Sequence, residues 1–399
     1  MKTRLAVGVA LAIALGAAAF FLRGPGALRV GVILPFTGPE AAYGLGMRNS
    51  IRLAVDEVNS RGGVQGRKVQ LVELDDASDP TRAAAAATRL ADDARVVAAL
   101  VHYDHECFSA TKLILKKAEL PDIVAGVSTM EELEGGGLAD EVRLLPYGKP
   151  QMKAAAAYAW EVLGARNFLY VREQSRLGLA MTGDFRNALS EVRKAPPATI
   201  TRDLLIRQGD SDFSQALAEV AKDRPDYVLF GGHPREAALL LTRLREAGFT
   251  GWFQSATHVP AQEFIDIAKD KAEGALQVFH GVPAGDTPAG KAYLDAYAKH
   301  GFAEPPSLYG IFAYAEAQSL LGAMDKSFLT RPSISGALHH EEFPTALGPI
   351  RFNYLSSSYQ TTAIYKVIQG RWVPIYTAKH ERIPGGDEDR VVLEAYPHP

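Results

Sequence analysis

The chain has little cysteine and no marked excess of either charge. Its one cysteine, Cys107, cannot form an intramolecular disulfide and cannot build a cysteine-based metal cluster. Its 43 Lys and Arg residues are balanced by 46 Asp and Glu residues, which leaves a formal net charge of −3. A nucleic-acid-binding protein would show a basic excess or a basic patch, so no nucleic-acid partner is expected.

Low-complexity tracts are also missing, because the 36 glycines and 23 prolines are spread along the 399 residues. Residues classed as hydrophobic make up 47% of the chain. This composition is typical of a folded globular protein. At about 150 residues per domain, the length predicts two domains with substantial cores.

Long apolar runs are confined to the N-terminus, where Lys2 and Arg4 precede an uncharged stretch from Leu5 to Leu22 that contains the small residues Ala17 to Ala19. This pattern predicts that residues 1–27 are an export signal. The run is also close to the shortest length that spans a bilayer, so an uncleaved membrane anchor is the alternative. Both interpretations place the rest of the chain in the periplasm or another extracytoplasmic compartment. The protein would then touch the membrane only through an uncleaved N-terminus.

From Leu28 onward, short apolar runs alternate with helical patterns. Arg29 to Pro35 has the composition of a buried parallel strand, and the apolar residues of 47–58 then recur at three- and four-residue spacing. Asp79-Pro80 is a typical helix start, since Asp accepts the unpaired backbone amides and Pro suits the first helical position. The alternation restarts after Pro150. We therefore expect an α/β fold with two parallel sheets, each covered by helices on both faces.

The end of the chain has a different pattern. Pro349 to Asn353, Thr361 to Ile368 and Trp372 to Tyr376 are predicted as antiparallel strands, with Gln369-Gly370 as a turn. The last residues are rich in charge, proline and glycine, and we expect them to form a charged surface extension.

Several collinear stretches resemble one family, the type I periplasmic solute-binding proteins related to the leucine/isoleucine/valine-binding protein. The most specific are Arg29-Val-Gly-Val-Ile-Leu-Pro-Phe-Thr-Gly-Pro39, Tyr43-Gly44, the segment Ala54 to Arg67, and Asp75-Asp-Ala-Ser-Asp-Pro80. Supporting stretches are Asp226 to Gly232, Ala313 to Leu320 and Gly348 to Asn353.

This resemblance implies the type I periplasmic binding protein fold, with two doubly wound parallel-sheet lobes joined by three hinge crossovers. Lobe 1 would comprise residues 28–147 and 279–347, and lobe 2 would comprise residues 148–278 and 348–399. It also implies the extracytoplasmic binding component of an ABC importer of the branched-chain amino acid type. Such a protein binds a small organic solute between its lobes, works as a monomer and delivers the solute to membrane subunits. Hinge closure around the solute is the expected mechanism.

The resemblance also places candidate ligand-binding residues in lobe 1. Tyr43 matches an aromatic wall of the family, and Tyr309 would close the mouth of the site. His105 stands where relatives carry a serine that binds the solute carboxylate, with Glu106 beside it. A loop of the family that uses backbone groups and a hydroxyl corresponds to Val127, Ser128 and Thr129.

In lobe 2 the matching positions are Arg176, Leu177, His233 and Thr257. Thr257 falls where amino-acid binders have a glutamate that pairs with the α-ammonium group. A buried ammonium without a carboxylate partner is costly, so this change weakens the case for a free α-amino acid. Amino acid-like solutes, amides and carboxylate or aromatic acids all stay open, since Glu106 or Asp104 could supply a displaced ammonium partner.

Two other functional classes stay open. A ligand-sensing receptor domain that signals to a membrane partner is the main alternative to an importer component. An enzyme on the same fold is a distant one, because no G-x-S-x-G, H-E-x-x-H, P-loop or G-x-G-x-x-G motif occurs in the sequence. Catalytic residues, cofactors and metal sites are therefore not expected.

Overall fold

The computed structural model describes residues 26–101, 105–124, 141–145, 148–193, 201–256, 260–353, 356–359, 361–382 and 389–397. Residues 1–25 of the predicted leader lie outside this set. The described residues form two compact units. Unit 1 holds those up to 142 and those from 295 to 355, whereas unit 2 holds those from 143 to 294 and from 356 onward. Within the described residues, no helix has the length and apolar character needed to cross a membrane.

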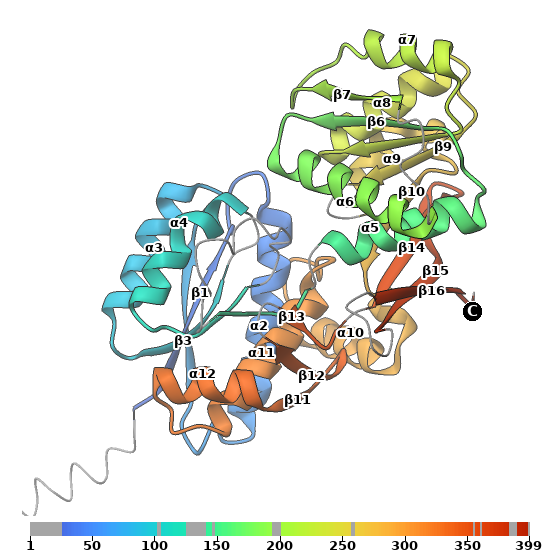
Figure 1. Ribbon diagram of the computed structural model, residues 1–399. Helices are drawn as coiled ribbons and strands as arrows, with labels where there is room; N and C mark the ends of the chain where they lie inside the picture. The colour runs from blue at the N-terminus through green and yellow to red at the C-terminus, as the bar shows by residue number, and fades with distance from the viewer. Residues whose placement is uncertain are drawn as a thin grey trace, which may run out of the picture. The chain divides into compact units, whose positions relative to one another are not determined.

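Unit 1 is built on a five-stranded sheet with the order β2-β1-β3-β4-β5. Figure 1 labels β1 and β3 of this sheet. The neighbours β2 and β1, β1 and β3, and β3 and β4 are paired in parallel. The strands are β1 (Leu28–Leu34), β2 (Val69–Asp75), β3 (Val96–Val101), β4 (Asp122–Val124) and β5 (Glu141–Arg143). The parallel sheet predicted from the apolar runs is confirmed for this unit.

Helices cover both faces of this sheet. α2 (Ala41–Ser60) follows β1, α3 (Pro80–Asp92) follows β2, and α4 (His105–Lys117) follows β3. Crossovers between parallel strands are right-handed, so the direction of each connection sets the face on which its helix lies. α2 packs against α11 (Gly310–Asp325), while α3 packs against α4. The predicted cap of α3 is confirmed, since Asp79 accepts hydrogen bonds from the backbone N–H groups of Thr81 and Arg82.

The second segment of unit 1 begins within α10 (Pro288–His300) and adds a mostly buried helix to the core. α11 has buried side chains around most of its surface, as expected for a helix between other elements. α12 (Arg331–His340) follows, and β11 (Glu342–Thr345) then pairs antiparallel with β12 (Gly348–Asn353).

Unit 2 contains an eight-stranded sheet with the order β16-β15-β14-β10-β9-β8-β6-β7 (Figure 1). Its parallel part consists of β6 (Phe168–Glu173), β7 (Thr201–Ile206), β8 (Tyr227–Gly231), β9 (Trp252–Ala256) and β10 (Leu276–His280). The antiparallel part consists of β14 (Thr362–Ile368), β15 (Arg371–Arg382) and β16 (Asp389–Ala395). The short β13 (Ser356–Ser357) precedes β14.

The strands of unit 2 divide their side chains between two cores. Phe168 and Tyr170 of β6 join a cluster on the side of α5 and α6, whereas Leu169 and Val171 join a cluster on the other side. This alternation follows from the two-residue period of a strand. The helices are α5 (Gly148–Ala157), continued by a π-helical turn at Tyr158–Val162, α6 (Arg176–Arg193), α7 (Ser214–Asp223), α8 (Pro234–Glu246) and α9 (Gln262–Ala268), with short 3₁₀ turns at Lys269–Ala272 and Ala284–Asp286.

The end of the chain differs from the expected surface extension. Asp389–Ala395 forms β16, which pairs antiparallel with β15. The reason is local, because Val391 and Leu393 alternate along this segment and pack against the core of unit 2. The two later divisions between the units also fall farther along the chain than the predicted lobe boundaries. β10 and the residues up to 294 stay with unit 2, and β12 pairs with β11 in unit 1.

Candidate functional site

The strand order of unit 1 marks one place where a ligand would be expected. The chain leaves β1 for β2 on one side and then returns to β3 on the other side of β1. The strand order therefore reverses between the carboxyl ends of β1 and β3, and open α/β sheets bind their ligands outside such a switch point. Tyr43 follows β1, and His105 and Glu106 follow β3.

Asp75 at the end of β2 holds the loop that leads from β1 into α2. Its Oδ1 accepts hydrogen bonds from the backbone N–H groups of Phe36 and Thr37, and its Oδ2 accepts one from the Thr37 hydroxyl at 2.7 Å. Arg82 also contacts Oδ2 at 2.8 Å. Burial alone would raise the pKa of Asp75, but these hydrogen bonds outweigh it and keep the pKa below its ordinary value. The loop before Tyr43 is thus tied to the neighbouring strand.

Tyr43 and Tyr309 form an aromatic pair in unit 1. Tyr43 lies in the first turn of α2 and Tyr309 precedes α11, yet their ring centroids are 6.2 Å apart with an interplanar angle of 76°. This edge-to-face geometry is a favourable one for aromatic rings. Tyr43 is half-buried and Tyr309 is buried. Burial raises the pKa of Tyr309 far above its ordinary value, so its phenol stays protonated.

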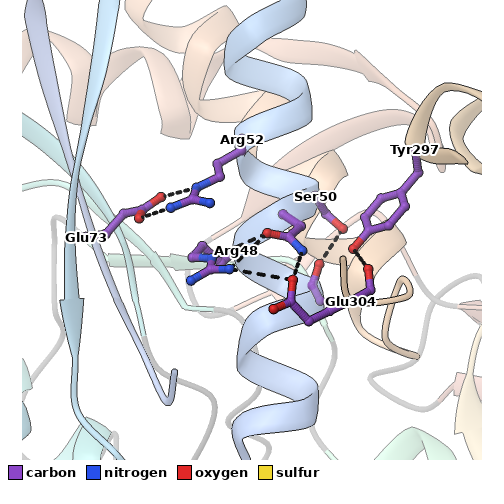
Figure 2. Close-up of polar contacts among 8 residues, drawn as sticks. Arg48, Ser50, Arg52, Glu73, Tyr297 and Glu304 are labelled. Carbon is purple, nitrogen blue, oxygen red and sulfur yellow. Dashed lines mark hydrogen bonds and ion pairs between the residues drawn. The ribbon is translucent and has the colours of Figure 1, made fainter. Parts of the chain in front are cut away.

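Polar contacts from α2 and α10 fix the loop that carries Tyr309 (Figure 2). The Asn49 amide donates a hydrogen bond to Oε2 of Glu304 at 2.9 Å, and the Tyr297 hydroxyl donates one to the Glu304 carbonyl at 2.9 Å. Arg48 adds a longer ion pair of 3.8 Å to Glu304. The hydrogen bond from Asn49 holds the pKa of Glu304 below its ordinary value.

A glycine lets the same loop approach α2 closely. A Cβ atom at Gly46 would lie 2.5 Å from the backbone nitrogen of Ser307, which is closer than real Cβ contacts come. On the other side of α2, Arg52 forms two hydrogen bonds of 2.6 and 2.5 Å with Glu73 of β2 (Figure 2). The helix is thereby held by β2 on one side and by the loop before α11 on the other.

Unit 2 has its own switch point, between β6 and β8. The chain leaves β6 for β7 at the edge and returns to β8 on the other side of β6. Glu173 is the last residue of β6, and His233 lies between the end of β8 and α8, after Gly232. Glu173 Oε1 accepts the backbone N–H of His233 at 2.9 Å, and Glu173 Oε2 lies 2.6 Å from Nδ1 of the His233 ring.

These two residues differ in exposure. The Glu173 side chain is 1% exposed, whereas the His233 side chain is 38% exposed. A glycine again permits the contact, because a Cβ atom at Gly232 would lie 2.7 Å from Oε1 of Glu173. Glu236 of α8 is also buried. One carboxylate oxygen of Glu173, one of Glu236 and one ring nitrogen of His233 lie within 4.8 Å of one another.

The structure places the other predicted residues as follows. Glu106 is exposed in the first turn of α4, and His105 begins that helix. Arg176 begins α6, and the neighbouring Leu177 is buried in the core of unit 2 beside α5 and α6. The side chains of His105 and Arg176, together with Val127, Ser128, Thr129 and Thr257, lie outside the described residues.

Two functional candidates escaped the sequence analysis. Glu173 was missed because its contact with His233 depends on β8 being placed directly beside β6, which no local pattern reveals. Glu304 was missed because its partner Asn49 is distant in sequence. The signal that could have pointed to Glu173 is Gly231-Gly232, since adjacent glycines at a strand end suggest that something packs closely there.

The comparison with known proteins identifies the family. The family described as periplasmic binding protein matches residues 27–369. A Leu/Ile/Val-binding protein, BraC3, from Rhizobium johnstonii is 27% identical over 351 residues, covering 87% of this chain and 93% of that one.

Two solved structures share the fold. The branched-chain amino acid transporter substrate-binding protein LivJ of Streptococcus pneumoniae, in complex with isoleucine, matches with a TM-score of 0.75 and 21% identity, covering 92% of this chain and 100% of that one. A solute-binding protein of an ABC transporter from R. palustris, in complex with benzoate, matches with a TM-score of 0.69 and 20% identity, covering 88% and 96%. Both the predicted fold class and the predicted resemblance are confirmed: the chain belongs to the periplasmic binding protein family.

Proposed function

We propose that the chain is the extracytoplasmic solute-binding component of an ABC importer of the branched-chain amino acid type. One observation carries this proposal beyond family membership. Each unit places a cluster of aromatic or ionisable side chains at the switch point of a doubly wound sheet, with Tyr43 and Tyr309 in unit 1 and Glu173 and His233 in unit 2. Two such half-sites suit a solute that is held by residues of both lobes and stabilises their closed form.

The residues that touch the solute are part of this proposal. In unit 1 we assign Tyr43, Tyr309 and the residues that follow β3 and β4, namely His105, Glu106, Val127, Ser128 and Thr129. In unit 2 we assign the starts of α6 and α8 and the residue after β9, namely Arg176, Leu177, His233 and Thr257. Leu177 would contribute through the packing of α6, since its side chain is in the core.

The solute class follows from two lines of support. The relatives are named for leucine, isoleucine and valine, and one structural neighbour holds benzoate. The resemblance places Thr257 of this chain where amino-acid binders carry a glutamate. We therefore propose a small organic solute that is amino acid-like, an amide, or a carboxylate or aromatic acid.

Localisation and partners follow the same reasoning. The family is extracytoplasmic, and Lys2, Arg4 and the apolar run after them support export through the N-terminal segment. We propose that the membrane subunits of the transporter are the partners of the solute-bound form. The chain would act as a monomer without a cofactor.

The decisive experiment is a thermal-shift screen of branched-chain amino acids, amides, aromatic acids and dicarboxylates, followed by calorimetry on each hit. A true solute raises the melting temperature in proportion to its concentration relative to its Kd. Small-angle scattering should then show a smaller radius of gyration with saturating solute. A protein that binds none of these compounds, or binds one without compaction, would contradict the proposal.

A sensory receptor domain is the alternative within binding proteins. N-terminal sequencing of the exported protein separates the two interpretations, because a retained anchor suits a tethered receptor and cleavage after Ala19 suits a free carrier. An enzyme on the same fold would convert a bound compound, so recovery of chemically altered solute after incubation would favour that class.

A further inference from the structure

The hydrogen-bond geometry of Glu173 and His233 locates one proton. Nδ1 of His233 and Oε2 of Glu173 are 2.6 Å apart, so a proton lies between them. Oε1 of the same carboxylate already accepts the backbone N–H of His233. In its carboxylate form Glu173 can only accept hydrogen bonds, and Nδ1 of the imidazole is then the atom that donates the shared proton.

The charges around the ring favour a second proton on it. The carboxylate of Glu173, on β6, lies beside the His233 ring. The carboxylate of Glu236, on α8, belongs to the same cluster of three residues. Arg235 of α8 forms an ion pair of 3.1 Å with Oε1 of Glu236, and Arg172 of β6 forms an ion pair with Asp203. In the segment after β7, the backbone N–H of Gly209 also donates a hydrogen bond to Oε1 of Glu236. The carboxylate of Glu173 is at hydrogen-bond distance from the ring.

One local effect works in the opposite direction. His233 precedes the first turn of α8, where the helix dipole amounts to about half a positive charge and disfavours a cation. The carboxylate of Glu173 carries a full negative charge at hydrogen-bond distance and is buried, where screening by water is weak. At hydrogen-bond distance, the carboxylate acts on the ring more strongly than the helix dipole does.

We propose that Glu173 is a positioning residue that fixes a proton on Nδ1 of His233 and holds the ring as a cation for an anionic group of the solute. The inference rests on the proposed function and narrows it, because it favours a carboxylate-bearing solute over a neutral amide of the same shape. The ring has the exposure to meet a solute, while its counter-charge is in the protein interior. A fixed tautomer also presents the remaining ring nitrogen in one orientation.

The binding test compares matched acids and amides in the full chain. The probes are benzoate with benzamide and isocaproate with isocaproamide, measured by calorimetry at several pH values. In Glu173→Gln we expect the affinity for the better-bound acid to fall about tenfold, while amide affinity stays within about twofold. His233→Gln should weaken acid binding at least as much. Glu246→Gln, which removes an exposed carboxylate on α8, is the matched control and should change neither.

The pH profile separates positioning from a general loss of structure. Acid affinity of the native protein should fall as pH rises through the imidazole titration, and that fall should move to lower pH in Glu173→Gln. Equal weakening of acids and amides, or an unchanged profile, would overturn the proposal.

A second measurement needs no ligand. Nitrogen-15 NMR of the histidine rings, with His233 assigned by its loss in His233→Gln, should show the proton on Nδ1 in the native protein and a lower titration midpoint in Glu173→Gln. A native ring protonated on the other nitrogen overturns the proposal. So does stoichiometric zinc in the purified protein that is lost in His233→Gln, since a metal would replace the shared proton. If native protein binds none of the probes, the proposed function loses support, and the NMR result decides this inference by itself.

Discussion

The ring of Tyr309 meets the ring of Tyr43 edge to face, 6.2 Å between centroids, and both belong to the same unit. The two residues come from different segments of the chain, since one precedes α11 and the other begins α2. Their contact exists because α2 and α11 pack side by side. Half-buried Tyr43 therefore has its orientation fixed by a partner that is fully packed.

The first prediction concerns this pair. Replacing Tyr43 by Ala should weaken solute binding about tenfold, because an aromatic contact contributes about 0.5–1.5 kcal/mol beyond its buried area. Calorimetry measures the affinity, and the melting temperature should change little because Tyr43 is only half-buried. Tyr43→Phe keeps the ring and serves as the control. Native affinity in Tyr43→Ala would remove this residue from the site.

The second prediction concerns the loop before α11. Glu304→Ala should increase amide hydrogen exchange across 301–309, because the carboxylate that bonds Asn49 is lost. Solute affinity should fall through the displacement of Tyr309. Glu341→Ala is the matched control, since it removes an exposed carboxylate paired with Lys326 in the same unit. Unchanged exchange in Glu304→Ala would show that the close approach at Gly46 holds the loop without this contact.

The third prediction uses a buried acid in α11. Glu316 is fully buried, and neither of its carboxylate oxygens has a hydrogen-bond partner among the described residues. Burial raises its pKa well above the ordinary value. A raised folded-state pKa means that this group costs stability as pH rises above its unfolded value. The melting temperature of Glu316→Gln relative to native should therefore be higher at pH 8 than at pH 4.5, and a constant difference would contradict this.

The fourth prediction concerns His280 at the end of β10. Burial lowers its pKa from 6.5 to about 3, so the ring is neutral in the folded protein and takes up a proton on unfolding in acid. Its contribution to stability is present above pH 6.5 and is lost as pH falls toward 3. His280→Phe should flatten the decline of melting temperature over this window. Replacement of the exposed His300 by Gln is the control. If the melting temperature of His280→Phe declined as steeply with falling pH as that of the native protein, His280 would not be the cause of the decline.

Local patterns predicted much of the fold. The apolar run around Val30 became a buried parallel strand, and Asp79 caps α3 as expected, because strand burial and capping depend on residues close in sequence. The end of the chain was misjudged, since charge and proline concealed the alternation of Val391 and Leu393.

The candidate site was predictable only in part. Tyr43 could be placed at the start of the helix that follows one apolar run, and His233 could be placed just after the end of another. Their partners Tyr309 and Glu173 could not be assigned from periodicity, since those contacts depend on which helix packs on α2 and which strand lies beside β6. Long-range packing sets both pairs.

The position of β14 in the sheet makes the folding of unit 2 depend on the last part of the chain. β14 pairs with β10, although the two strands belong to separate segments of unit 2 with part of unit 1 between them. An amino-terminal fragment ending before β14 would leave β10 with an open edge of unpaired backbone groups. Assembly of this sheet must therefore await the last part of the polypeptide, and a chain halted earlier would present a strand edge prone to aggregation.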